Sequence, residues 1–279
     1  MERHGINMEW NESYTKYTQL NLFPPEPAPP DPRGPATVTW NCWHGCSKVS
    51  PGCLHCYMYR RDEAIGKNPS VVEKTGSFNL PVRRLRSGQY KGRYKVPHAS
   101  LIYTCFSSDF FHRDADAWRP AAWAMIRERS DCTFFMITKR PERIADHLPP
   151  DWQEGWDHVH IAVTCENQWA ADRRLPIYLP LPLRHRSVMV EPMLSAVDLR
   201  TYFLHNPGAI ESVSVGGESG PDARPCDYRW VLELHQQCLD HHIGFSYHQT
   251  GAKLIKDGKI YHIPRRLQHE QARKAGLDL

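Results

Sequence analysis

Seven short apolar runs recur along this chain and are separated by longer segments with helical patterns. Each run is four or five residues long and nearly free of charge, which is typical of parallel strands covered on both faces. Apolar residues fall on one helical stripe in residues 116–129, 167–178 and 228–242. This alternation predicts an α/β fold in which a parallel sheet curls into a partial or near-complete β/α barrel. The predicted strands are residues 37–40, 101–105, 133–137, 159–163, 187–190, 212–215 and 244–248.

Polar residues stand at the carboxyl ends of six of these predicted strands. In β/α barrels these ends meet at one face, where catalytic groups collect. We therefore expect a deep polar site on that face. The strand-end residues are Ser107, Ser108, Asp109, Lys139, Glu166, Asn167, Glu191, Gly216, Gly217, Glu218 and His248.

The loop after the first predicted strand holds four of the nine cysteines, within residues 42–56. Cys46, Cys53 and Cys56 form a C-x6-C-x2-C pattern that also contains Gly45 and Gly52. Glycine permits the backbone angles of a tight wrap, so the loop can direct three thiolates at one inorganic centre. Three ligands rather than four would leave one coordination position open. The loop should lie on the same face as the polar strand ends.

Three interpretations of the loop are compatible with its residues. A structural zinc ion would need Cys42, His44 or His55 as a fourth ligand, and such sites usually have two short ligand pairs rather than one. A redox-active C-x-x-C pair would leave Cys46 without a role. A [4Fe-4S] cluster would use all three cysteines and leave one iron free to bind a substrate or cofactor.

A series of motifs occurs in order over roughly residues 38–250: Trp40-Asn41, the cysteine loop up to Tyr57, residues 108–112, 138–143 and 166–173, Glu191-Pro192, and residues 216–220. In this order they resemble the radical S-adenosylmethionine (SAM) superfamily, and within it a branch common in phages and bacteria. The first cysteine gap is six residues, as in that branch, whereas the superfamily usually has three. Cys42 stands where the branch usually has proline, and as a fourth ligand it would exclude SAM.

The resemblance implies a radical-SAM-like barrel with a [4Fe-4S] cluster on Cys46, Cys53 and Cys56. SAM would bind the open iron and be cleaved to a 5′-deoxyadenosyl radical that abstracts hydrogen from a substrate. An electron donor such as a flavodoxin or ferredoxin would supply the cluster. The residues expected at the SAM and substrate site are Tyr57, Ser107, Ser108, Asp109, Glu166, Asn167, Gly216, Gly217 and Glu218.

These residues have different expected roles. The Ser107–Asp109 group is nearest to the methionine moiety, and Glu166 with Asn167 would bind the ribose. Tyr57 would cover the adenine, shield the cluster or simply pack as an aromatic. The glycine pair before Glu218 would allow close approach to SAM or to substrate, or else form a turn before a helix.

Glu191, His248 and Lys139 are the candidate catalytic residues. Glu191 and His248 could transfer a proton or bind substrate, although a lone histidine is more often structural. Lys139, with Arg140 and Arg143, could hold a phosphate or carboxylate. The alternative is that these cations form ion pairs with Glu142 or Glu166.

Two basic segments are candidates for contact with nucleic acid. Residues 83–95 contain six basic residues and two tyrosines, and a second run at residues 253–266 includes a turn-like Asp-Gly pair. Cations would neutralise phosphates and tyrosines would stack on bases, but such runs are also common on solvated surfaces. The contact residues expected in the first segment are Arg83, Arg84, Arg86, Tyr90, Lys91, Arg93, Tyr94 and Lys95.

The chain divides into a proline-rich arm (1–37), a barrel (38–251) with a basic insertion (74–98), and a C-terminal extension (252–279). It lacks a signal peptide and a run of about 18 apolar residues, so we expect a cytoplasmic protein without a membrane span. The net charge of +4 permits a nucleic-acid partner.

We expect a radical SAM enzyme that modifies or repairs a nucleobase in DNA or RNA, or a nucleotide. Two alternatives are a radical SAM enzyme for a small metabolite or peptide, and a non-catalytic nucleic-acid-binding protein stabilised by zinc or a cluster. A deep polar mouth favours an enzyme.

Overall fold

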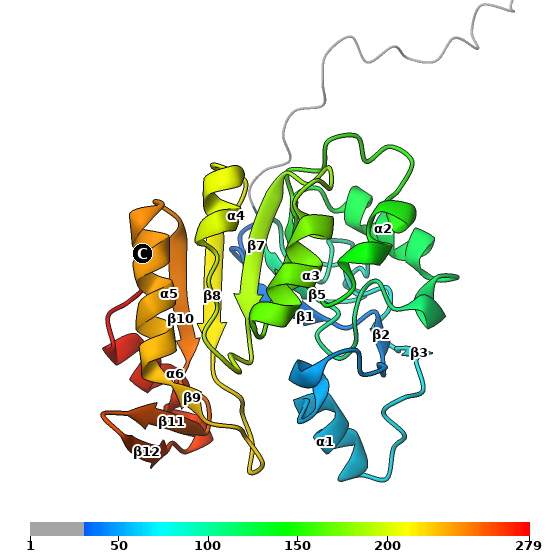
Figure 1. Ribbon diagram of the computed structural model, residues 1–279. Coiled ribbons are helices and arrows are strands. Elements are labelled where there is room, and N and C mark those ends of the chain that lie inside the picture. Colours follow the sequence, from blue (N-terminus) through cyan, green and yellow to red (C-terminus); the bar gives the residue numbers. More distant parts are fainter. Residues whose placement is uncertain (1–30) are drawn as a thin grey trace, which may run out of the picture.

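The computed structural model describes residues 31–279, so residues 1–30 of the predicted arm lie outside the described part (Figure 1). Its centre is a curled sheet of seven parallel strands in the order β1-β4-β5-β6-β7-β8-β10. The sheet does not close, because β1 and β10 are its two edges. The strands are β1 (Thr37–Trp40), β4 (Leu101–Thr104), β5 (Thr133–Thr138), β6 (Val159–Thr164), β7 (His185–Val190), β8 (Ser212–Gly216) and β10 (Gly244–Gln249).

These seven strands are the seven predicted ones, and each bound agrees within two residues. The prediction of a partial β/α barrel is therefore confirmed. The helices are α1 (Tyr57–Glu63), α2 (Arg119–Glu128), α3 (Gln168–Tyr178), α4 (Arg200–His205), α5 (Tyr228–Asp240) and α6 (Arg265–Lys274). The helices expected from apolar stripes correspond to α2, α3 and α5. Asn167 begins α3 by accepting a hydrogen bond from the Ala170 amide at 2.8 Å, and Asp227 caps α5 in the same way.

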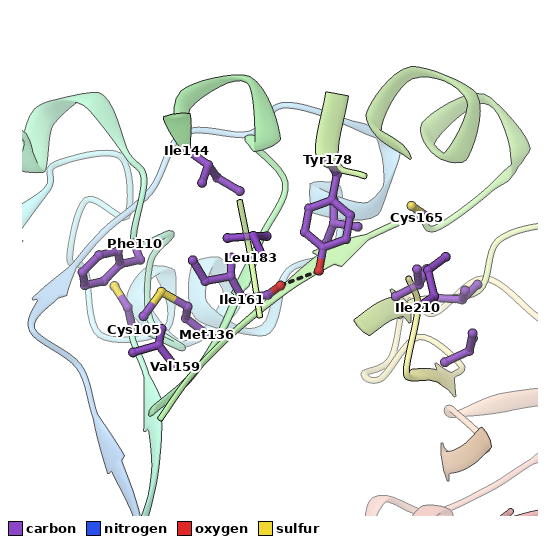
Figure 2. Packing of buried hydrophobic residues seen from close by; sticks show 14 of the residues in the cluster. Cys105, Phe110, Met136, Ile144, Val159, Ile161, Cys165, Tyr178, Leu183 and Ile210 are labelled. Carbon is purple, nitrogen blue, oxygen red and sulfur yellow. Dashed lines mark hydrogen bonds between the residues drawn. The ribbon is translucent and has the colours of Figure 1, made fainter. Parts of the chain in front are cut away.

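Successive side chains along each strand point to opposite sides of the sheet, so the sheet has two different faces. On the convex face, residues such as Met136, Ile161 and Val188 are fully buried in the main apolar core. Figure 2 shows Tyr178 of α3 reaching back to this face, where its hydroxyl donates to the Ile161 carbonyl at 2.5 Å. The opposite, concave face is hollow and contains a cavity.

Smaller elements surround the sheet at its carboxyl end. β2 (Trp43–His44) pairs with β3 (Glu73–Lys74), and β9 (Cys226–Asp227), β11 (Lys253–Lys256) and β12 (Lys259–His262) form a three-stranded sheet. The short 3₁₀ helices are η2 (Pro51–Cys53), η3 (Arg113–Ala115), η4 (Pro141–Arg143) and η5 (Ala145–His147). Figure 1 shows that the arrowheads of β7, β8 and β10 point to the end of the molecule that carries α1, β11 and β12. Within residues 31–279, no helix is both long and apolar enough to cross a membrane.

Candidate functional site

The cavity on the concave face measures about 640 Å³ and extends along most of the strand length. Its walls run from Leu101 and Ser212, at the amino ends of β4 and β8, to the cysteine loop beyond the carboxyl ends. This volume is in the range of ordinary small-molecule sites. The cavity therefore joins the cysteine loop and most of the sheet interior in a single space.

Cys46, Cys53 and Cys56 all line this cavity, and each is partly buried. The loop is fixed by the backbone: the Gly45 amide donates to the Ser107 carbonyl at 3.1 Å and the Cys46 amide donates to the Pro69 carbonyl at 2.9 Å. Gly45 has φ +92°, and a Cβ there would lie 2.0 Å from the Val71 carbonyl oxygen. Glycine is thus required where the loop turns, as the sequence predicted.

Arg140 provides the positive charge nearest to the thiols. Its two terminal nitrogens lie 3.8 Å from Cys46 Sγ, and one of them also donates to Asp109 at 3.0 Å. Burial raises the pKa of Cys46 to about 11, although Arg140 acts in the opposite direction. The guanidinium would stabilise a thiolate at this position, and the thiolate is the form of cysteine that binds metal.

The three sulfurs are not gathered as closely as the ligands of a single metal ion. In residues 31–279, the only three His, Cys, Asp or Glu ligand atoms found within 4.8 Å of one another belong to His160, His185 and Glu211. The three thiols are therefore more widely spaced than around one zinc ion, where tetrahedral Zn–S bonds of about 2.3 Å set S···S distances near 3.8 Å. A multinuclear cluster presents its ligand positions farther apart than a single ion does.

Cys42 and His44, two of the candidate fourth ligands of a zinc site, are placed differently from the three cysteines. Cys42 is fully buried and is not among the residues that line the cavity. His44 Nε2 is 2.7 Å from Asp62 Oδ2. Cys105, which follows β4 directly, is the fourth cysteine that lines the cavity, and no sequence pattern singled it out.

Tyr57, Ser107, Ser108 and Asp109 line the cavity next to the cysteines. The Ser107 hydroxyl donates to the Trp43 carbonyl at 3.2 Å, and the hydroxyls of Ser108 and Tyr57 donate to the carbonyls of Gly45 and Phe106. These side chains hold the loop as well as facing the cavity. Their expected contacts with SAM stay predictions.

Glu166 and Asn167 do not line the cavity. Glu166 is completely buried, where Oε2 accepts from Arg174 at 2.6 Å and Oε1 accepts from the Gly52 amide at 3.3 Å. Burial alone would raise the pKa of Glu166, but Arg174 lowers it below its usual value. Asn167 is occupied as the cap of α3. Glu166 thus holds the cysteine loop and Asn167 holds the start of α3. Ribose binding stays a prediction for both residues.

Gly216, Gly217 and Glu218 also lie outside the cavity lining. A Cβ on Gly217 would stand 2.3 Å from the Thr250 carbonyl oxygen, because the backbones that follow β8 and β10 meet there. Glu218 is ion-paired with Arg224, whose Nη2 donates to the Pro51 carbonyl at 3.0 Å. Gly217 thus serves backbone packing, an added Cβ at Gly216 would meet the Glu191 carboxylate at 2.9 Å, and Glu218 is connected through Arg224 to the cysteine loop.

Glu191 and His248 face each other in the cavity wall. His248 Nδ1–H donates to Glu191 Oε2 at 3.0 Å, and the Ser214 hydroxyl donates to Oε1 at 2.6 Å. The Glu191 carboxylate raises the pKa of His248. The arrangement can hold a proton close to a substrate in the cavity.

Lys139 also faces the cavity, and its Nζ lies 3.4 Å from the Thr164 hydroxyl. Within residues 31–279 it forms no ion pair, whereas Arg140 pairs with Asp109 and Arg143 with Asp116. The expected ion pairs with Glu142 or Glu166 are therefore not formed. Lys139 is the member of the basic cluster that could bind an anionic substrate group.

A family model described as "Protein of unknown function (DUF5131)" matches residues 36–278. The chain belongs to this family. No curated protein and no solved structure gives a significant match. The matched region covers the barrel, the cysteine loop and the C-terminal hairpin together.

The cavity has one aromatic wall and one hydroxyl-rich wall, which the sequence did not reveal. Tyr103, Phe106 and Phe135 pack against one another, with Tyr103 5.1 Å and 5.9 Å from the other two ring centroids. Facing residues on β7, β8 and β10 are Ser187, Ser212, Ser214 and Ser246. The alternate serines in these strands were a period-two signal for a polar inner face.

The basic segment at residues 83–95 lies away from the cysteine loop. It precedes β4, and Arg129 at the end of α2 donates to the Pro81 and Val96 carbonyls. Tyr94 is held between the guanidinium groups of Arg84 and Arg129, at 4.2 and 4.3 Å, and is not free to stack on a base. Arg83 donates to the Gly76 carbonyl and Arg33 lies over Tyr90. The other cations, which are exposed, are Arg84, Arg86, Lys91, Arg93 and Lys95.

Proposed function

We propose that the protein is a radical SAM enzyme whose [4Fe-4S] cluster is held by Cys46, Cys53 and Cys56. The observation that carries the proposal is that all three thiols line the same cavity as the polar strand ends. Such a cluster, when reduced, supplies the electron that cleaves SAM to a 5′-deoxyadenosyl radical. A flavodoxin or ferredoxin would be the electron source.

The cysteines and the residues around them support this role. The three sulfurs do not all lie within 4.8 Å of one another, as the ligands of a single zinc ion would, and Arg140 offers positive charge beside Cys46. Cys42 is buried outside the cavity lining, so it does not join Cys46, Cys53 and Cys56 at the open space. The curled parallel sheet surrounds the site with its concave face.

The walls of the cavity support a nucleobase, in a nucleotide or in DNA or RNA, as the substrate. A planar ring can pack on Tyr103 and Phe135, while ring nitrogens and carbonyls bond to the serines on the facing wall. Lys139 provides an unpaired cation for a phosphate, and the Glu191–His248 pair can hold a proton at a ring atom. A small metabolite or peptide would use the aromatic wall less fully.

Anaerobic reconstitution with iron and sulfide tests the proposal. We expect a [4Fe-4S] electron paramagnetic resonance signal after reduction, changed on addition of SAM, and formation of 5′-deoxyadenosine. Cys46→Ala, Cys53→Ala and Cys56→Ala should each abolish 5′-deoxyadenosine, whereas Cys42→Ala should retain the cluster and the product. Stoichiometric zinc without SAM cleavage would refute the proposal.

A further inference from the structure

The C-terminal extension forms a β-hairpin at the same end of the molecule as the cysteine loop (Figure 1). β11 and β12 pair antiparallel in a register that places Lys256 opposite Lys259. Asp257 and Gly258, at φ +52° and +72°, form the two-residue turn suggested by the sequence. All four residues of β12 are exposed, including Ile260 at 55% and Tyr261 at 45%.

A second cavity of about 510 Å³ lies behind this hairpin, between it and α6. We call it the hairpin cavity; the residues that define its chemistry are Tyr228, Tyr247, Tyr261, Lys256 and Lys274. Tyr247 is 2% exposed, whereas Tyr261 on β12 is 45% exposed and available to a ligand.

The hairpin and the start of α6 carry positive charge that is not ion-paired within residues 31–279. Residues 253–266 contain five Lys and Arg side chains and one carboxylate, Asp257. None of these five cations has a carboxylate within 4.0 Å in the part of the chain that the structure describes. Cations spread over both strands and the start of α6 can reach more than one phosphate, while tyrosines can stack on bases whatever their sequence.

We propose that the hairpin cavity binds a base of a single-stranded DNA or RNA segment, next to the nucleotide that enters the central cavity. The position of α6 supports this pairing of cavities. On one side, the ring of His269 contacts that of His248 at 4.7 Å between centroids. On the other side, Leu267 and Gln271 line the hairpin cavity. The two cavities thus lie on either side of β10, with Tyr247 lining one and His248 the other, and α6 packs on this strand.

The hairpin, rather than residues 83–95, would then form the nucleic-acid interface. This inference rests on the nucleic-acid part of the proposed function and names the form of the substrate. The basic insertion precedes the amino end of β4, whereas β11 and β12 lie beyond the carboxyl ends, where the central cavity meets the cysteine loop. An oligonucleotide held by the hairpin would therefore have a shorter path to the central cavity than one held by residues 83–95.

Binding of a fluorescent single-stranded oligonucleotide to the reconstituted full-length protein tests the proposal without requiring turnover. The double variant Lys256→Glu/Lys259→Glu should weaken binding at least tenfold and flatten the dependence of log K on log[salt] by about one to two. Tyr261→Ala should weaken binding about tenfold through loss of stacking.

The matched control is Arg86→Glu/Lys91→Glu, which changes the net charge equally but on the basic insertion. We expect it to bind like the unaltered protein. Unchanged binding by the hairpin variants, loss confined to the insertion variant, or binding of anionic vesicles but of no oligonucleotide would each overturn the hairpin proposal. SAM cleavage is measured separately, so any of these results leaves the radical SAM proposal to its own test.

Discussion

At the scale of single residues, Asp109 connects the sheet to the cysteine loop. Its carboxylate accepts from the amides of Phe111 and Lys139, from the Thr138 hydroxyl and from Arg140, all between 2.8 and 3.0 Å. The Asp109 and Arg140 side chains are 7% and 6% exposed. Since Arg140 also touches Cys46, the carboxylate positions the one guanidinium that faces the thiols.

Asp109→Asn should therefore destabilise the protein by about 3–5 kcal/mol, because it leaves a buried guanidinium without its counter-charge. Urea unfolding of the cluster-free chain measures this loss. The exposed Asp146→Asn is the matched control and should change the free energy of unfolding by less than about 0.5 kcal/mol. Equal midpoints for the two variants would show that Asp109 has no such role.

His248 provides a test by pH. Glu191 raises the pKa of His248 above its usual 6.5, so the protonated imidazole is favoured in the folded state. The resulting stabilisation should be fully present below pH 6.5 and be lost as the pH rises through the folded-state pKa. In Glu191→Gln, the imidazole should titrate nearer 6.5 by nuclear magnetic resonance, and the loss of stability should be larger at pH 6 than at pH 9. An unchanged His248 titration would contradict the pairing.

At the scale of elements, the junction of β8 and β10 depends on a missing side chain. The Gly217 amide donates to the Gln249 carbonyl at 3.0 Å, and a Cβ at Gly217 would overlap the Thr250 carbonyl. Gly217→Ala should lower the free energy of unfolding by about 1–3 kcal/mol through overpacking. Gly76→Ala, where an added Cβ meets nothing within 4 Å, is the control and should be near neutral. Thermal and urea unfolding would compare the two.

The strands were predictable because each is a short apolar run, and burial on the convex face preserves that pattern. The residues around the cysteines were harder to assign. Ser107 and Asp109 line the cavity, but Glu166 and Gly217 support the cysteine loop and the strand junction instead. A strand-end position tells which face a residue approaches, but not whether its side chain faces the cavity or a neighbouring backbone. That choice depends on long-range partners such as Arg174 and Thr250.

At the scale of the whole molecule, a half-open parallel sheet must protect its free edges. The C-terminal residues cover the free edge of β10. The Leu279 amide donates to the Phe245 carbonyl at 2.9 Å, and Asp278 Oδ1 accepts from the Tyr247 amide at 2.8 Å. α6 packs on the same strand. The extension therefore completes the wall that carries His248 as well as presenting the hairpin.

Removal of residues 276–279 should consequently expose the backbone of β10 between Phe245 and Tyr247. We expect a lower melting temperature and concentration-dependent self-association, detected by sedimentation velocity, because an unpaired edge strand is a template for pairing with a second chain. Asp278→Ala, which loses only the bond to the Tyr247 amide, should have the smaller effect of about 1 kcal/mol. A truncated protein that remains monomeric with an unchanged melting temperature would mean that the tail does not protect the edge.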